Sequence, residues 1–129
     1  MRSMPLASFE FEYLVDRRVL VATTRGFWTE ETAREYMAAL ACEIGKVRRT
    51  SRRFAILSDA REFPVQAEAV MKILAAQSSA NDGVRKLAIV VSSALNTMQA
   101  QRSFPSDRIR AFKDMNDALT WLDSDTKQV

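Results

Sequence analysis

The hexapeptide Phe54-Ala55-Ile56-Leu57-Ser58-Asp59 decides the fold that this sequence predicts. Its first four residues are apolar, and the apolar run stops abruptly at a serine and an aspartate. A strand with apolar side chains at every position is buried on both faces, which is typical of a parallel sheet covered by helices. We therefore expect a central strand here that carries polar side chains to one end of a sheet.

A second run of the same kind lies further along the chain. Residues 87–91 read Leu-Ala-Ile-Val-Val, and Ser92 and Ser93 follow them directly. Apolar residues at helical spacing separate the two runs, and strands joined through a helix are parallel. We therefore predict that the segments around Ile56 and Ile89 lie side by side and point the same way in one sheet.

The N-terminal third predicts a hairpin followed by a long helix. Residues 9–15 largely alternate between apolar and polar side chains, residues 19–24 are rich in β-branched side chains, and only three residues separate them. Thr29 is a good N-cap, and the two glutamates after it place negative charge at the positive end of a helix. This helix should run to about Gly45 or one turn beyond.

The remaining elements complete an α/β domain. Pro64 suits the first turn of a second helix, residues 94–104 predict a weaker helix, residues 109–112 predict a short strand, and Asp114 caps a last helix. The order is β-β-α-β-α-β-α-β-α. We predict one domain over residues 1–129, with a core from about 7 to 123. It has a five-stranded, mostly parallel sheet with an antiparallel N-terminal edge strand, and four helices.

Missing residue types exclude several kinds of site from this chain. It has no histidine and a single cysteine, Cys42, so it offers no Ser-His-Asp or Cys-His nucleophile and no structural zinc site. Its three glycines, Gly26, Gly45 and Gly83, lie far apart, which excludes a P-loop or a dinucleotide-binding turn. We therefore expect no catalysis, no metal and no cofactor.

The same reasoning places the chain in a reducing compartment. Its apolar runs are far shorter than the ~20 residues of a membrane span, and we see no secretory signal at the N-terminus. A single cysteine cannot form an internal disulfide, which fits a cytoplasmic protein.

Five segments, in this order along the chain, resemble a known family. They are the opening hairpin, Gly26-Phe27-Trp28-Thr29, the strand ending Leu57-Ser58-Asp59, residues 86–90, and residues 110–112 followed by residues 118–122. From about residue 9 to residue 122 the chain is similar to the STAS domains of the SpoIIAA-like group, which also resemble SEC14-type lipid-binding folds. The resemblance implies a regulatory or binding domain in a bacterial cytoplasm, often dimeric, without catalysis of its own.

One departure from this family concerns its phosphorylation site. The resemblance implies a serine or threonine just after the aspartate of the central strand, where anti-sigma-factor antagonists of the group are phosphorylated. Here Asp59 is followed by Ala60, Arg61, Glu62 and Phe63, none of which has a hydroxyl group. We therefore do not expect a phosphorylation switch at this position.

The carboxyl ends of the parallel strands are the first candidate site, because ligands of open α/β sheets bind at that edge, near helix N-termini. The side chains expected there are Arg25, Trp28, Asp59, Arg61, Ser92 and Ser93. Together they would hold an anionic or partly aromatic ligand, or a loop of a partner protein. The structural alternative is that Asp59 caps a helix or pairs with Arg61 and that the serines end a strand.

Basic residues at the opposite edge are the second candidate. Residues 46–53 carry five cations and no acidic residue in a chain of net charge +3, and further cations precede the other strands. This basic rim comprises Lys46, Arg48, Arg49, Arg52 and Arg53, with Arg17, Arg18, Arg85, Lys86 and Arg108. It would either compensate the negative C-terminal ends of helices or attach an acidic protein or a membrane surface. Nucleic acid is not expected, because no aromatic residue interleaves with the cations of residues 46–53.

Self-association is the third candidate. Strands that are apolar on both faces need a cover on both, so a second copy would be required if all helices lie on one face. Met98, Phe104 and Trp121 are the apolar residues expected at such a homodimer surface. We predict a non-catalytic regulatory domain that acts through protein–protein interaction, as a homodimer or with another regulatory protein. The alternative is a binder of a small anionic molecule or lipid at the carboxyl edge.

Overall fold

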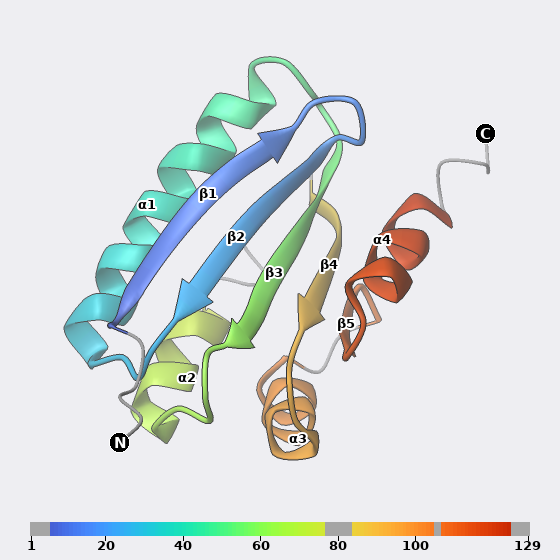
Figure 1. Ribbon diagram of the computed structural model, residues 1–129. Coiled ribbons are helices and arrows are strands. Elements are labelled where there is room, and N and C mark those ends of the chain that lie inside the picture. The colour runs from blue at the N-terminus through green and yellow to red at the C-terminus, as the bar shows by residue number, and fades with distance from the viewer. Residues whose placement is uncertain (1–5, 77–83, 105–106, 125–129) are drawn as a thin grey trace.

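The structure, a computed structural model, describes residues 6–76, 84–104 and 107–124. Its elements in chain order are β1 (Ser8–Leu14), β2 (Val19–Arg25), α1 (Glu30–Arg48), β3 (Phe54–Glu62), α2 (Glu68–Ala76), β4 (Val84–Val90), α3 (Ala94–Ser103), β5 (Ile109–Phe112) and α4 (Met115–Asp123) (Figure 1). This is the predicted order, so the predicted fold class is confirmed. Residues 1–5 and 125–129 of the predicted domain, and Gly83, lie outside the described residues.

The five strands form one sheet in the order β1-β2-β3-β4-β5, with β3 in the middle. β1 runs antiparallel to β2, whereas each of the pairs β2–β3, β3–β4 and β4–β5 is parallel. Ile56 pairs with Leu87 and Ser58 with Ile89, so the two apolar segments lie side by side in the same direction, as predicted.

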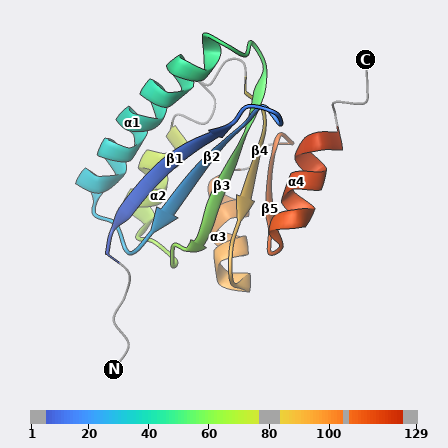
Figure 2. The same cartoon turned by 45° about the horizontal axis from the view of Figure 1, so that its top comes forward.

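Helices cover the two faces of this sheet unequally. α1, α2 and α3 pack on one face, whereas α4 packs on the other and contacts β3, β4 and β5 (Figures 1 and 2). The parallel strands advance through the sheet in one direction, and crossovers of one hand then place their helices on one face. We call the face under α1, α2 and α3 the helix face, and the other the open face.

Alternation along β3 explains why both faces need a cover. Phe54 and Ile56 point into the core of the helix face, and Ala55 and Leu57 point into the smaller core under α4. All four are at most 3% exposed. Burying a large apolar side chain contributes roughly 1.5–3 kcal/mol, so this strand anchors both layers.

β3 is longer than the sequence indicated. We expected the strand to stop at Ser58 and Asp59, but it continues to Glu62. The neighbouring β2 extends to Arg25, and the backbone N–H of Gly26 donates to the carbonyl of Glu62 at 2.9 Å, so β3 still has a partner beyond its apolar part. Asp59 and Arg61 consequently lie within the strand, two residues apart, and share one face.

The start of α2 also differs from the prediction. Pro64 was expected in the first helical turn, but the helix begins at Glu68. The intervening residues are held in a non-helical loop because the backbone N–H of Gln66 donates to the Gln99 side chain at 3.1 Å. A proline signal alone could not reveal this contact, which spans 33 residues of sequence.

Lys86 fastens the C-terminal end of α4 to the sheet. Its ammonium donates to the carbonyl of Trp121 and to the hydroxyl of Ser124, both at 2.8 Å, and lies 4.4 Å from the centre of the Trp121 ring. The neighbouring Arg85 donates to the carbonyl of Leu122 at 2.6 Å. Cations thus meet the carbonyl groups that the last turn of a helix leaves without partners.

We predict that Lys86→Met lowers the free energy of unfolding by about 1–3 kcal/mol, because hydrogen bonds from a charged donor are lost while the apolar stem is kept. Lys72→Met, on the exposed surface of α2, is the matched control and should change stability by less than about 0.5 kcal/mol. Urea unfolding followed by tryptophan fluorescence measures both. Equal effects of the two variants would contradict the anchoring role of Lys86.

Candidate functional site

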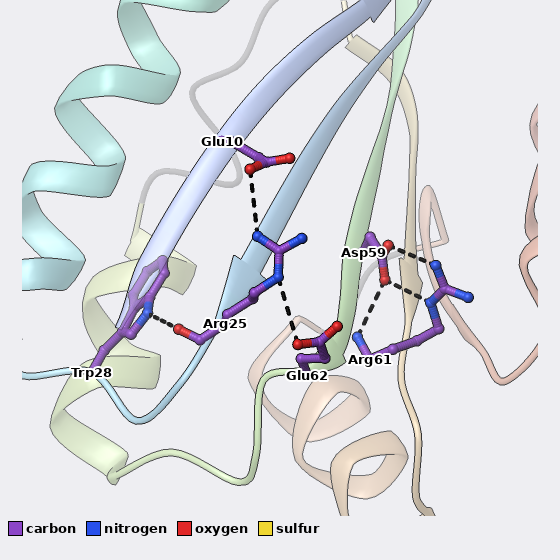
Figure 3. A network of polar contacts seen from close by, with 6 residues as sticks. All are labelled: Glu10, Arg25, Trp28, Asp59, Arg61 and Glu62. Atoms are coloured by element: carbon purple, nitrogen blue, oxygen red, sulfur yellow. Dashed lines mark hydrogen bonds and ion pairs between the residues drawn. The ribbon is translucent and has the colours of Figure 1, made fainter. Parts of the chain in front are cut away.

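Trp28 lies in the core on the helix face. It is 1% exposed, and its ring centre lies 5.9 Å from Phe9, 5.1 Å from Tyr36 and 4.8 Å from Phe63. Its indole N–H donates to the backbone carbonyl of Arg25 at 2.8 Å (Figure 3). The structure therefore separates Trp28 from the other residues of the first candidate site and gives it a packing role.

Gln66 ties together three segments at the carboxyl edge of the sheet. Its side-chain oxygen accepts from the backbone N–H of Trp28 at 2.8 Å, and its side-chain nitrogen donates to the carbonyls of Gly26 and Pro64 at 3.0 and 2.7 Å. The Gln99 amide of α3 donates to the Gln66 carbonyl at 2.7 Å. We call residues 26–29, 63–67 and 91–93 the carboxyl-edge loops.

Sequence reasoning missed Gln66. A neutral glutamine beside a proline looks like a solvated residue of a first helical turn, and glutamine is mostly exposed in proteins. Here it is 4% exposed, and both atoms of its amide group are hydrogen-bonded. The lone sequence signal was its place between an apolar strand and an amphipathic helix, which does not distinguish a buried amide from an exposed one.

Asp59 and Arg61 form a closed pair on the open face. The Arg61 guanidinium donates to both carboxylate oxygens of Asp59, from Nε and from Nη2, each at 2.9 Å (Figure 3). The backbone N–H of Arg61 adds a third hydrogen bond at 3.3 Å. These hydrogen bonds from Arg61 lower the pKa of Asp59 below its ordinary value, although partial burial opposes the shift. The predicted structural alternative, pairing of Asp59 with Arg61, describes this geometry.

Arg25 is paired as well. It lies at the end of β2 between two glutamates, with its Nη1 3.4 Å from Glu10 of β1 and its Nε 3.6 Å from Glu62 of β3 (Figure 3). These distances exceed those of a bidentate pair, and all three side chains are partly exposed. Each contact therefore contributes little to stability, about 0–1 kcal/mol.

The two sets of ion pairs surround a shallow depression of about 320 Å³, lined by Thr23, Thr24, Arg25, Asp59, Arg61 and Glu62. Its size would admit a small metabolite. However, both guanidinium groups already contact carboxylates, so an anionic ligand would have to compete with Asp59, Glu10 or Glu62 for them. This arrangement disfavours the anion-binding interpretation of the carboxyl edge.

Ser92 and Ser93 lie where β4 ends and α3 begins. The Ser93 hydroxyl accepts from the backbone N–H of Asn96 at 3.1 Å and donates to its side-chain oxygen at 2.5 Å, which makes Ser93 the N-cap of α3. Ser92 is exposed. Of the predicted site residues, the structure thus joins Arg25, Asp59 and Arg61 in one depression, whereas Ser93 serves as a cap.

Four residues of the basic rim bind groups at the end of α4 or in β4, and the other six are exposed to solvent. Arg17 pairs with Asp123 at 2.8 Å, Arg108 donates to the carbonyl of Val84 at 3.3 Å, and Arg85 and Lys86 bind α4 as described above. Lys86 is 8% exposed, so it is not part of an accessible rim. The side chains of Arg18, Lys46, Arg48, Arg49, Arg52 and Arg53 are exposed. An attachment role for Arg48, Arg49, Arg52 and Arg53 at the C-terminal end of α1 stays a prediction.

Two further observations concern acid–base chemistry and metal ligands among the described residues. A carboxyl group that acts as a general acid or base near neutral pH needs a raised pKa, whereas the pKa of Asp59 is lowered. Within residues 6–76, 84–104 and 107–124, no three histidine, cysteine or acidic side chains gather around a common point. In the same part of the chain, none of the helices has the length and apolar character that crossing a bilayer requires.

Comparisons with known proteins agree with this architecture. The sequence model of the SpoIIAA-like family matches residues 19–123. An uncharacterized protein from Shewanella loihica PV-4 with a SpoIIAA-like fold is 20% identical with a TM-score of 0.65, over 95% of this chain and 99% of that one. An anti-sigma factor antagonist from Mycobacterium paratuberculosis is 21% identical with a TM-score of 0.59, over 93% and 98%. A comparison with curated protein sequences gave no match.

We predict that Gln66→Leu destabilises the protein by about 2–4 kcal/mol, because it leaves the Trp28 N–H and the Gly26 carbonyl buried without partners. Gln101→Leu, at an exposed position of α3, is the control and should be nearly neutral. Hydrogen exchange should show the amide of Trp28 losing protection in Gln66→Leu. Unchanged protection at Trp28 would refute the role of Gln66 as the tie between the loops.

We further predict a pH-dependent cost of Asp59→Asn. Because the folded pKa of Asp59 is lowered, its carboxylate stabilises the protein above the unfolded pKa of 3.8, and this contribution disappears as the pH falls through the folded pKa. The Arg61 side chain is 51% exposed, so the cost at pH 7 should be only about 1 kcal/mol.

Urea unfolding between pH 2 and pH 7 measures this cost, with Asp107→Asn at an exposed position as the control. The stability difference between wild type and Asp59→Asn should shrink toward the acid end of the range. A difference that stays constant with pH would contradict the pairing.

Proposed function

We propose, because this chain belongs to the SpoIIAA-like family, that it is a non-catalytic regulatory domain that acts by binding another protein. The neighbour from Mycobacterium paratuberculosis is an anti-sigma factor antagonist, a class of protein that works through a protein partner. A regulatory protein of a bacterial cytoplasm is therefore the partner that we propose for this chain.

The observation that carries this proposal is a set of exposed apolar side chains at the carboxyl edge. They are Phe27 (53% exposed), Val65 (42%), Leu95 (68%) and Met98 (57%). Phe27 and Val65 lie in loops that Gln66 holds, and Leu95 and Met98 lie in α3, which Gln99 joins to the same residue. Apolar side chains presented on an ordered scaffold are typical of a surface for a protein partner.

The edge carries no hydroxyl group for a phosphorylation switch where α2 begins. No serine or threonine occurs between Asp59 and Glu68, the first residue of α2. The loop that precedes α2 is instead fixed by the neutral amide of Gln66. We therefore propose that this domain presents its partner surface constitutively, and that control of binding lies elsewhere.

We also propose a homodimer. Its interface would not be the open face of the sheet, which was the reason for expecting a second copy from the sequence. α4 covers the β3–β5 part of the open face, so the apolar central strands do not need a second chain. Phe104 is partly buried against the core of the helix face and Trp121 packs on Phe112, whereas Leu95 and Met98 of α3 remain exposed. We therefore propose that self-association would use the exposed apolar residues of the carboxyl edge, which include Leu95 and Met98 of α3.

Site-specific photo-cross-linking in the source cell tests the proposal. A photoreactive amino acid at Val65 should give an adduct with another protein, whereas the same group at Val15 should not. Val15 is 70% exposed and lies at the opposite edge, in the turn between β1 and β2.

The partner identified by mass spectrometry is then purified for titration calorimetry. Val65→Ser and Leu95→Ser should each weaken binding about tenfold, which corresponds to roughly 1.4 kcal/mol, and Val15→Ser should leave it unchanged. Adducts with only a second copy of this chain would replace the regulatory partner by self-association. Equal binding by all three variants would refute the carboxyl edge as the surface.

A further inference from the structure

Basic side chains gather at the end of the domain that lies opposite the carboxyl-edge loops. Two segments meet there, the turn between β1 and β2 (residues 15–18) and the stretch from the last turn of α1 to the start of β3 (residues 46–53) (Figures 1 and 2). The backbone N–H of Ala55 donates to the carbonyl of Arg18 at 2.9 Å, which joins the start of β3 to the turn. We call residues 15–18 and 46–53 together the amino edge.

The charge of the amino edge is almost all positive. Its residues include seven basic side chains and one acidic side chain, that of Asp16. Lys46 pairs with Glu43 at 3.3 Å, and Arg17 pairs with Asp123 at 2.8 Å. Four exposed arginines have no ion-pair partner among the described residues: Arg18, Arg49, Arg52 and Arg53. Their charge is therefore available to an anionic surface outside the chain.

Stabilisation of α1 accounts for only part of this charge. Cations in the last turn of a helix offset the negative end of its dipole, and the effect fades beyond that turn. Lys46 and Arg48 occupy the last turn of α1, whereas Arg52 and Arg53 follow its C-cap. The helix dipole therefore explains the first two cations better than the two arginines that come after them.

Arg18 has a backbone conformation that arginine rarely adopts. Its φ is 57°, in the left-handed region, and within the described part of the chain it is the one residue other than glycine with a positive φ. Glycine or asparagine fits this conformation with less strain. An arginine at a strained position points to a role for its side chain. Since no described carboxylate pairs with it, we look for that role outside the chain.

An exposed apolar side chain lies beside these cations. Val15, in the same turn as Arg18, is 70% exposed. A basic cluster next to an exposed apolar side chain suits an anionic bilayer, because the cations meet the charged headgroups while the apolar group enters the interface. Nucleic acid would instead call for aromatic side chains, and the amino edge has none. Val15 thus favours a lipid surface over a partner that offers negative charge alone.

We propose that the amino edge attaches this domain reversibly to a bilayer that contains anionic lipids. The inference goes beyond the proposed protein interaction and does not depend on it, because the carboxyl-edge loops lie at the other end of the sheet (Figure 1). A domain attached in this way presents those loops away from the membrane. Each exposed cation adds about fivefold to the affinity for an anionic surface, and salt screens this attraction.

Flotation of the full chain with lipid vesicles tests the proposal. Vesicles of phosphatidylcholine with about one third phosphatidylserine should bind the chain at ~0.1 M salt and release it at ~0.5 M, whereas phosphatidylcholine alone should not bind it. Arg52→Gln combined with Arg53→Gln should weaken binding about 25-fold. Lys72→Gln combined with Arg102→Gln removes two exposed cations from α2 and α3 and is the matched control. It should change the affinity less than about twofold.

Arg18→Gly is a second test, because its two expected effects have opposite signs. Glycine relieves the left-handed strain, so the melting temperature should rise. Loss of the cation should weaken binding to the phosphatidylserine vesicles about fivefold. Unchanged vesicle binding by this variant would contradict the role proposed for Arg18.

Val15→Trp reports on contact with the lipid interface. Measured against the wild type, the added tryptophan emission should shift to shorter wavelength with the phosphatidylserine vesicles. Failure of these vesicles to bind the chain, or equal losses in the two double variants, would overturn the proposal. If polyglutamate of the same total charge binds as tightly as the vesicles do, an acidic protein replaces the membrane as the partner and the proposal fails as well.

Discussion

The burial of β3 on both of its faces is the constraint on which the rest of the structure depends. Alternate side chains of its apolar half point into two separate cores, so the sheet needs helices on each side. The crossover helices α1, α2 and α3 all pack on one face of the sheet, so α4 is the helix that covers the other face. Lys86 and Arg85 hold α4 in this position, because they donate hydrogen bonds to carbonyls at its C-terminal end.

The incomplete cover by α4 explains the polar half of β3. Beyond Ser58, α4 no longer covers β3. The side chains that β3 presents on the open face are apolar up to Leu57 and charged at Asp59 and Arg61. These charges satisfy one another, which keeps an exposed sheet surface from acting as an apolar patch. The ion pairs thus have a structural explanation that does not require a ligand.

The carboxyl edge is organised by a neutral amide instead of by charge. The Gln66 side chain hydrogen-bonds to backbone groups of two loops, and its own backbone carbonyl accepts from Gln99 of α3. The exposed apolar residues therefore lie on loops and a helix that are held together. A braced surface loses little conformational entropy on binding, which favours a protein partner. Gln99 and Asn96 also line the half-open apolar pocket between the sheet and α1, α2 and α3.

Local patterns in the sequence determined the order of the elements, the parallel pairing of the two apolar strands and the caps at Thr29 and Asp114, whereas the cap at Ser93 became apparent only in the structure. Periodicity and capping depend on neighbouring residues, so the chain itself reveals them. The pairing of Asp59 with Arg61 was one structural alternative that the sequence offered, but its geometry depends on the continuation of β3 to Glu62, which the sequence did not reveal. Only the tertiary structure decided that Trp28 is buried, that Gln66 joins three segments and that α4 packs on the second face. Each of these depends on contacts between residues far apart in the sequence, and no local pattern encodes which distant groups will meet.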